Sequence, residues 1–321
     1  MGTSRNCIGV DIGGTKIAGG LVTPDGEILR RLERPTNASE GGPKILARAG
    51  DLIAELIASS PGGVGGIGVA SGGQINPETG IVFSATPLIP GWVGMRIKDI
   101  LEERFGVPVR AMNDASAAAV GEWRFGAARG VDDFVLLTIG TGVGGGVFAD
   151  GKLLAGALGA AGAIGHMVID CDGRPCNCGS RGCLEAYTSG LSIANRAIAL
   201  ASERGLDNDL VRGIRSDVYA GARLLGEAAK SGDPFALEVI REAGEYLGWG
   251  LASLLNLFNP SLVVIGGSMA ELGDIFLGPA WEIARKNCLR HDSDPARLVT
   301  ARLGNDAGLL GAAALIFDEI G

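Results

Sequence analysis

Three glycine-rich segments, each directly after a short apolar run, constrain the fold of this 321-residue chain more than any other feature. Short apolar runs bounded by glycine are typical of buried β-strands. The first two segments lead into further strand-like residues, at 17–22 and 147–149, so they predict β-hairpins. The glycine-rich segments are 11–16, 140–146 and 266–268, and the apolar runs before them are 7–10, 134–139 and 262–265.

Glycine at such corners lets backbone N–H groups point at a bound anion without obstruction by a Cβ atom, which is how loops hold phosphates. Neither hairpin is a P-loop, because the first lacks the Gly-Lys-Ser/Thr ending and both run from strand to strand. One such segment alone could be a simple turn, but the three together favour a nucleotide site. Two hairpins around the phosphates are the arrangement of the actin-like ATPase (ribonuclease H-like) fold, an α/β fold with two domains around a central cleft.

The remaining pattern agrees with two α/β domains. Residues 1–112 read as strands and turns with a helix at 43–59, whose apolar residues follow helical spacing. From 113 to 304 the glycine hairpin returns and long helices follow, the clearest at 233–258. We therefore predict a small domain at 1–112, completed by the C-terminal helix within 305–321, and a larger domain at 113–304.

A cluster of metal-ligand residue types lies in the larger domain. Within eighteen positions, one histidine is followed by Cys171 and then by three closely spaced cysteines, and a Cys3His set is a common closed ligand set for structural Zn²⁺. Thiols with one and four residues between them are poorly spaced for disulfides with each other. Free cysteines beside an unrelated histidine are the alternative, which is disfavoured because the chain has only three other cysteines. The predicted ligands of this zinc-binding segment, 166–183, are His166, Cys176, Cys178 and Cys183.

Asp114 is the catalytic candidate. It follows an apolar run that ends at Asn113 and precedes an alanine-rich helix, so it could be the N-cap of that helix. The same position, at the end of a strand in a cleft, also suits a base that accepts a proton from an alcohol during phosphoryl transfer. Asn113 beside it would hydrogen-bond a sugar hydroxyl.

Together these motifs resemble the ROK family of sugar kinases and repressors. The resemblance runs from residue 7 to about residue 317, and the pattern Cys-x-Cys-Gly-x-x-Gly-Cys-x-Glu is highly specific. It implies an actin-like kinase that uses ATP and Mg²⁺ to phosphorylate a hexose, usually at the 6-hydroxyl. The residues that carry it are 11–16, Asn113, Asp114, 140–146, Gly165, His166 and 176–185.

The resemblance also implies roles for individual residues. Asp114 would be the general base. Sugar contacts would come from Gly73, Thr86, Asn113, Asp114, His166 and Glu185. Mg²⁺ and the phosphates would be held by Asp11, Gly13, Gly14, Thr15, Lys16, Thr141 and Gly142, with Gly266 and Gly267 near the adenosine.

One position departs from the family pattern. Kinases of the family normally carry Glu-x-Gly-His. In this chain the same four positions are Ala163-Ile-Gly-His166, so alanine stands where the glutamate is expected. Alanine cannot accept hydrogen bonds from sugar hydroxyls, so a contact of about 1.5–3 kcal/mol is missing if it was charge-assisted. We expect weakened sugar binding with the chemistry retained, and a catalytically impaired sugar-binding protein is the alternative.

The identity of the hexose stays open between glucose and an N-acetylated hexosamine such as N-acetylmannosamine or N-acetylglucosamine. The segment 71–80 and Thr86 resemble N-acetylmannosamine kinases of the family, and glucokinases usually have Asn where Thr86 stands. Against this, Gln74 replaces an arginine of the N-acetylmannosamine kinases.

Composition limits the partners. The net charge of −8 and the absence of a basic run disfavour nucleic acid and anionic membranes. No signal peptide or membrane span is visible in the sequence, and reduced thiols at a metal site fit a cytoplasmic location. A transcriptional repressor is disfavoured because a DNA-binding helix-turn-helix would precede this fold, whose first strand starts at residue 7. The family resemblance implies a homodimer or homotetramer.

Overall fold

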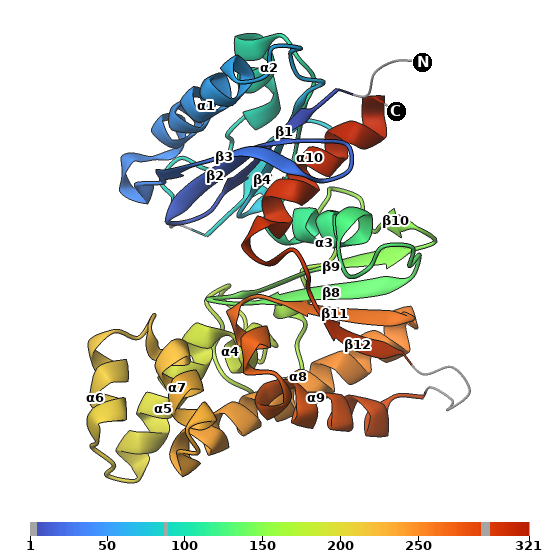
Figure 1. Cartoon of the computed structure of the whole chain (residues 1–321). Helices are drawn as coiled ribbons and strands as arrows, with labels where there is room; N and C mark the ends of the chain where they lie inside the picture. Colours follow the sequence, from blue (N-terminus) through green and yellow to red (C-terminus); the bar gives the residue numbers. More distant parts are fainter. Residues whose placement is uncertain (1–4, 87–88, 290–295, 321) are drawn as a thin grey trace. The chain divides into compact units, whose positions relative to one another are not determined.

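The structure is a computed structural model that describes residues 5–86, 89–289 and 296–320 (Figure 1). It divides into two compact units. Unit 1 comprises Met1–Val131, Lys152–Gly162 and Arg302–Gly321, and unit 2 comprises Asp132–Gly151 and Ala163–Ala301. His291, the second histidine, lies outside the described residues.

Unit 1 is built on a five-stranded sheet with the strand order β3-β2-β1-β4-β7. Strand β1 pairs antiparallel with β2 and parallel with β4, and β4 pairs parallel with β7. Its strands are β1 (Cys7–Ile12), β2 (Lys16–Val22), β3 (Ile28–Pro35), β4 (Ile67–Ser71), β5 (Gln74–Ile75), β6 (Val82–Ser84) and β7 (Val109–Asn113). Its helices are η1 (Ala38–Glu40), α1 (Gly42–Ala58), α2 (Ile97–Phe105), α3 (Asp114–Phe125), η4 (Gly304–Asp306) and α10 (Ala307–Ile320).

Glycines let α10 approach the backbone of this sheet. A Cβ atom on Gly9 or on Gly68 would overlap the carbonyl groups of Leu309 or Ala312. Figure 1 shows α10 running alongside β1 and β4. The opposite face of β1 contributes Ile8, Val10 and Ile12 to a core that also contains the apolar face of α1.

Helix α3 belongs to unit 1, so the observed division lies after Val131 and not after residue 112. The physical reason is a close crossing of α3 and α10, in which Gly311 packs against the carbonyl of Ala117. A side chain at Gly311 would separate the two helices.

Unit 2 repeats the same sheet topology, with the strand order β10-β9-β8-β11-β12. Strand β8 pairs antiparallel with β9 and parallel with β11, so the β8–β9 hairpin corresponds to the β1–β2 hairpin. The strands of this sheet are β8 (Phe134–Ile139), β9 (Val143–Ala149), β11 (Leu262–Gly266) and β12 (Arg297–Thr300), together with β10 (Lys152–Leu153), whose residues fall within the ranges of unit 1. The helices are η2 (Ile164–His166), α4 (Glu185–Thr188), α5 (Gly190–Glu203), α6 (Asp209–Ser216), α7 (Gly221–Lys230), α8 (Pro234–Phe258), η3 (Ser268–Leu272) and α9 (Asp274–Asn287).

The loop formed by the second glycine segment, 140–146, is shorter than predicted. Strand β9 starts at Val143 and not at residue 147, because Gly144, Gly145 and Gly146 pair with β8. Gly145 is enclosed: a Cβ atom there would lie 2.6 Å from the Ile164 side chain and 2.8 Å from the Leu136 carbonyl oxygen. The loop itself is therefore limited to residues 140–142.

The longest helix, α8, has the ends that its sequence predicts. The Asp233 side chain accepts a hydrogen bond from the Ala236 N–H (2.8 Å), and Pro234 occupies the first helical position, where no N–H partner is needed. Asn259 ends the helix in the left-handed conformation, with φ of 44°. Among the described residues, no helix combines the length and apolarity that a membrane span requires.

A buried carboxylate, Glu122, joins the end of α3 to two loops of unit 1. Its side chain is 0% exposed. One oxygen accepts from the Ala127 N–H (2.6 Å), and the other accepts from the N–H groups of Arg302 and Leu303 (both 2.8 Å). The loops joined in this way directly precede and follow the points where the chain passes between the units.

We predict that Glu122→Ala lowers the free energy of unfolding by about 3 kcal/mol, because it leaves buried N–H groups without acceptors. Glu122→Gln should also destabilise the protein, since an amide NH₂ would face N–H donors. Denaturant unfolding measures both effects, and Glu103→Ala, at an exposed position of α2, is the matched control. A Glu122→Ala protein as stable as this control would contradict the assignment.

Candidate active site and metal centre

Asn113 and not Asp114 caps helix α3. The Asn113 side-chain oxygen accepts from the N–H groups of Ala115 (3.0 Å) and Ser116 (3.2 Å), and its amide nitrogen donates to the Gly73 carbonyl (2.9 Å). The Asp114 carboxylate accepts a hydrogen bond from the Ala115 N–H (2.8 Å). The capping role that could have explained Asp114 therefore falls to its neighbour.

The charge of Asp114 acts on Asp11 within unit 1. Burial raises the pKa of Asp114 above its ordinary value. Burial, and then the charge of Asp114, raises the pKa of Asp11 from 3.8 to about 7. Two carboxylates that repel each other in this way favour either a shared proton or a bound cation. Oxygen ligands of this kind suit Mg²⁺, so the residues present fit such an ion.

The first hairpin, between β1 and β2, presents an exposed turn beside Asp11. The Gly13 N–H donates to the Lys16 carbonyl (2.9 Å), and both Gly14 and Thr15 are exposed. The Thr36 hydroxyl, from outside the turn, donates a hydrogen bond to the Gly13 carbonyl (2.7 Å). Lys16 is directed to the sheet, because its ammonium group pairs with Glu33 at 2.9 Å.

Gly73 and Thr86 lie near the ends of the small β5–β6 sheet of unit 1. Gly73 has φ of 97°, and a Cβ atom there would lie 2.8 Å from the Ser84 carbonyl oxygen, so the position requires glycine. Thr86 is exposed. The Asn113–Gly73 hydrogen bond ties this region to the start of α3.

In unit 2, the second and third glycine segments meet at one cavity. Gly267 has φ of 83° and packs against the Ile139 carbonyl at the end of β8, where the second loop begins. The cavity beside them has a volume of about 370 Å³. Its lining includes Gly140 and Thr141 of the second loop, Ser268 at the end of the third segment and Met269 after it. Tyr219, just before α7, and Arg223, within α7, also line it.

Glu185 connects the second loop to the metal-ligand segment. Its Oε2 atom accepts from the Val143 N–H at 2.8 Å, at the point where the loop becomes β9. Its Oε1 atom lies 3.9 Å from the Cys176 Sγ atom. The carboxylate is half-buried at the start of α4.

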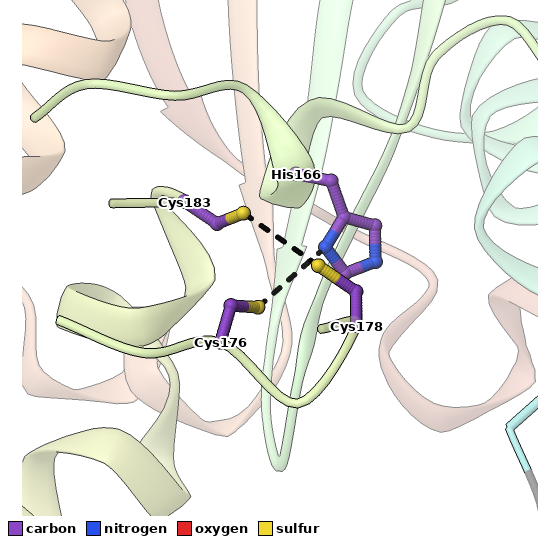
Figure 2. A group of neighbouring side chains, drawn as sticks. All are labelled: His166, Cys176, Cys178 and Cys183. Atoms are coloured by element: carbon purple, nitrogen blue, oxygen red, sulfur yellow. Dashed lines mark hydrogen bonds between the residues drawn. The ribbon is translucent and has the colours of Figure 1, made fainter. Parts of the chain in front are cut away.

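The four predicted zinc ligands converge on a common centre (Figure 2). The His166 Nδ1 atom lies 3.8 Å from Cys176 Sγ, and Cys178 Sγ lies 3.7 Å from Cys183 Sγ. A tetrahedral Zn²⁺ with bonds of about 2.3 Å to sulfur separates its sulfur ligands by about 3.8 Å. Burial raises the pKa of Cys176 to about 12, so metal binding at this thiol would displace its proton. Spacing and donor chemistry therefore fit Zn²⁺.

Comparison with known proteins identifies the family. The model of the ROK family matches residues 7–319. This chain belongs to the ROK family. Over 318 residues it is 38% identical to a glucokinase of Halalkalibacterium halodurans, which covers 98% of this chain and 96% of that protein.

A solved ROK structure and a regulator complete the comparison. The crystal structure of a ROK family glucokinase from Streptomyces griseus in complex with glucose and AMPPNP is 36% identical. It has a TM-score of 0.80 and covers 97% of this chain and 98% of that one, which confirms the predicted actin-like ATPase fold. A xylose repressor of Caldicellulosiruptor bescii is 30% identical, covering 98% of this chain and 78% of the repressor.

Two parts of this ROK site were not predicted from sequence. Tyr219, Arg223 and Lys230 line the cavity, yet they belong to no motif and lie in a stretch where no helix was predicted. Gly308, at the start of α10, lies against the Asp11 carboxylate: a Cβ atom there would be 2.8 Å from its Oδ2. A glycine within an alanine-rich helix was the available signal for this second position.

We predict that the Asp11 carboxyl titrates near pH 7 in the metal-free protein, as measured by NMR with carboxyl-labelled aspartate. Because its pKa is higher in the folded than in the unfolded state, its stabilising contribution is full below about pH 4 and is lost as the pH rises to about 7. Asp114→Asn should lower the pKa of Asp11 by removing a neighbouring charge, whereas Asp99→Asn should not. Titration near pH 4 in the wild type would contradict this assignment.

Proposed function

We propose that this protein transfers the γ-phosphate of ATP to the 6-hydroxyl of a hexose, with Asp114 as the general base. The coarser activity, an ATP-dependent sugar kinase, is that of its ROK relatives. The observation that carries the finer proposal is that Asn113 supplies the capping bonds of α3, so Asp114 is left for chemistry. Asp114 stands at the end of a strand, in the first turn of a helix.

Asp114 has the properties that a proton acceptor needs in phosphoryl transfer. In such reactions the protein mainly positions groups and neutralises charge, so a carboxylate close to the attacking hydroxyl suffices. Burial raises the pKa of Asp114, which makes the ionised carboxylate a stronger base. The proton of the sugar hydroxyl would move to the Asp114 carboxylate as the oxygen attacks phosphorus.

The nucleotide would bind at the glycine hairpins. Gly13, Gly14 and Thr15 in the first hairpin, and Thr141 and Gly142 in the second, would direct N–H groups at the phosphates. The cavity of about 370 Å³ beside Gly140 and Thr141 would take the nucleoside, with Gly266 and Gly267 directly before Ser268 of its lining. Asp11 would hold Mg²⁺, which neutralises phosphate charge when bound. The pairing of Lys16 with Glu33 supports a flanking role for this lysine.

Structural Zn²⁺ would be held by His166, Cys176, Cys178 and Cys183. In this role the metal fixes the segment that carries His166 and Glu185, the two residues of unit 2 that we propose as sugar contacts. Gly73, Thr86 and Asn113 would be the corresponding contacts from unit 1. Thiolate ligands require a reducing compartment, which supports a cytoplasmic location.

The substrate would be glucose or an N-acetylated hexosamine such as N-acetylmannosamine. Ala163 immediately precedes the short helix η2, which ends at His166, and its carbonyl accepts from the His166 N–H at 3.0 Å. The position is thus adjacent to the proposed sugar contact, and alanine there offers no side-chain acceptor. This favours a second candidate function, a sugar-binding ROK protein with impaired catalysis.

Assembly as a homodimer or homotetramer is also proposed from the family. Trp249 and Leu257 support it, because both are large apolar side chains exposed on one helix, α8.

A coupled assay of ADP formation over a panel of hexoses tests the kinase proposal. We expect turnover with at least one hexose, and a loss of about 10³-fold in kcat for Asp114→Asn, because proton acceptance is removed. Asp99→Asn, an exposed aspartate of α2, is the matched control and should retain activity. Absence of turnover with every hexose in zinc-replete protein would leave the impaired sugar-binding protein as the function.

Restoring an acceptor at position 163 tests the role of this position. Ala163→Glu should lower the KM for the sugar by about tenfold or more, because a charge-assisted hydrogen bond is gained. Ala163→Gln, a neutral acceptor of similar size, should give a smaller gain. Unchanged KM and kcat in Ala163→Glu would show that the position does not contact the sugar.

A further inference from the structure

Val143, at the end of the second glycine loop, is held on two sides by the segments that carry the metal ligands. On one side, its N–H donates to Glu185, two residues after the ligand Cys183. On the other, Gly165, the residue before the ligand His166, packs so closely that a Cβ atom would overlap the Val143 carbonyl. Both polar groups of the Val143 backbone are thus in contact with metal-ligand segments.

The segments that carry His166 and Cys183 are also joined to each other directly after these two ligands. The Leu184 N–H donates to the Met167 carbonyl at 2.9 Å, which connects the residues directly after Cys183 and His166. Cys183 and Leu184 are fully buried, so these residues have little freedom when the ligands are fixed. Fixing His166 and Cys183 at one ion therefore fixes both sides of the contact with Val143.

The glycine loop has little freedom beyond these contacts. A Cβ atom on Gly142 would lie 2.7 Å from the Glu185 Oε2 atom, so the carboxylate lies directly against the loop. At the other end of the loop, the Gly190 N–H donates to the Gly140 carbonyl at 2.7 Å. Gly190 starts α5, and the Ser192 hydroxyl of that helix donates to the Glu185 carbonyl at 2.8 Å.

We propose that Glu185 and the metal centre set the conformation of the nucleotide loop, so that both raise nucleotide affinity when no sugar is present. In this role Glu185 is a positioning residue: it holds the Val143 N–H and, through it, residues 140–142. The inference rests on the proposed function, because it requires the loop to bind the phosphates of a nucleotide. It adds to the sugar contact proposed for Glu185 a second role that does not involve the sugar.

Calorimetric titration of the sugar-free, zinc-loaded protein with AMPPNP tests this role. Glu185→Ala should raise the Kd by about tenfold, because a hydrogen bond to a charged acceptor is lost and the loop gains freedom. Glu185→Gln should raise it by less than about threefold, because the amide oxygen can still accept from Val143. Glu245→Ala, an exposed position on α8, is the matched control and should bind as the wild type does.

Zinc removal provides a second test of the proposal. Chelation should raise the Kd of the wild type for AMPPNP, with circular dichroism confirming that the protein stays folded. The same treatment should have a smaller effect in Glu185→Ala, because the two changes act through one contact. An unchanged Kd in zinc-loaded Glu185→Ala would overturn the proposal, whether or not the zinc-free protein folds. A wild type that binds no AMPPNP would overturn the proposed kinase function, and this inference with it.

Discussion

The hydrogen bonds of one amide, Asn113, determine the backbone arrangement around Asp114, the proposed general base. They cap α3 and tie its first turn to Gly73. Without this cap, the neighbouring Asp114 would be the natural acceptor for the free N–H groups of the helix. With the cap in place, Asp114 stands at the end of β7 with a raised pKa and acts on the pKa of Asp11. In the proposed mechanism, the Asn113 amide therefore has the structural role and the Asp114 carboxylate has the chemical role.

The same topology in the two units explains why two glycine hairpins occur in one chain. Each unit is built on a sheet in which an antiparallel hairpin leads into parallel strands. The two hairpins differ in the residues that contact their turns. In unit 1 the turn lies beside Asp11 and is tied to Thr36, whereas in unit 2 it lies against Glu185 and the metal-ligand segments. The two units thus present glycine hairpins of the same topology in different surroundings.

The sequence alone predicted the features whose own residues form a recognisable local pattern. The strand at 134–139 agrees with the prediction to the residue, and the four metal ligands converge as their spacing suggested. Sequence could not decide between Asn113 and Asp114 as the cap, because both side chains cap helices and helix starts are uncertain by a residue.

Other features depended on contacts between distant residues. Gly144, Gly145 and Gly146 lie in a strand against their intrinsic preference, and at Gly145 the Ile164 side chain occupies the space that a Cβ atom would need. The assignment of α3 to unit 1 follows from its crossing with α10, far along the chain. Helices α6, α7 and α9 carry no motif, so the cavity wall that contains Tyr219 was visible only once the helices were packed.

The central claim, phosphoryl transfer to a sugar hydroxyl, is tested most directly by the identity of the product. Phosphorus NMR of a reaction with ATP and a hexose should show one phosphate ester per ADP, with its phosphorus coupled to the two protons on carbon 6. Release of inorganic phosphate with no sugar ester would contradict the account, because the nucleotide would then be hydrolysed by water and no sugar hydroxyl would act as the acceptor.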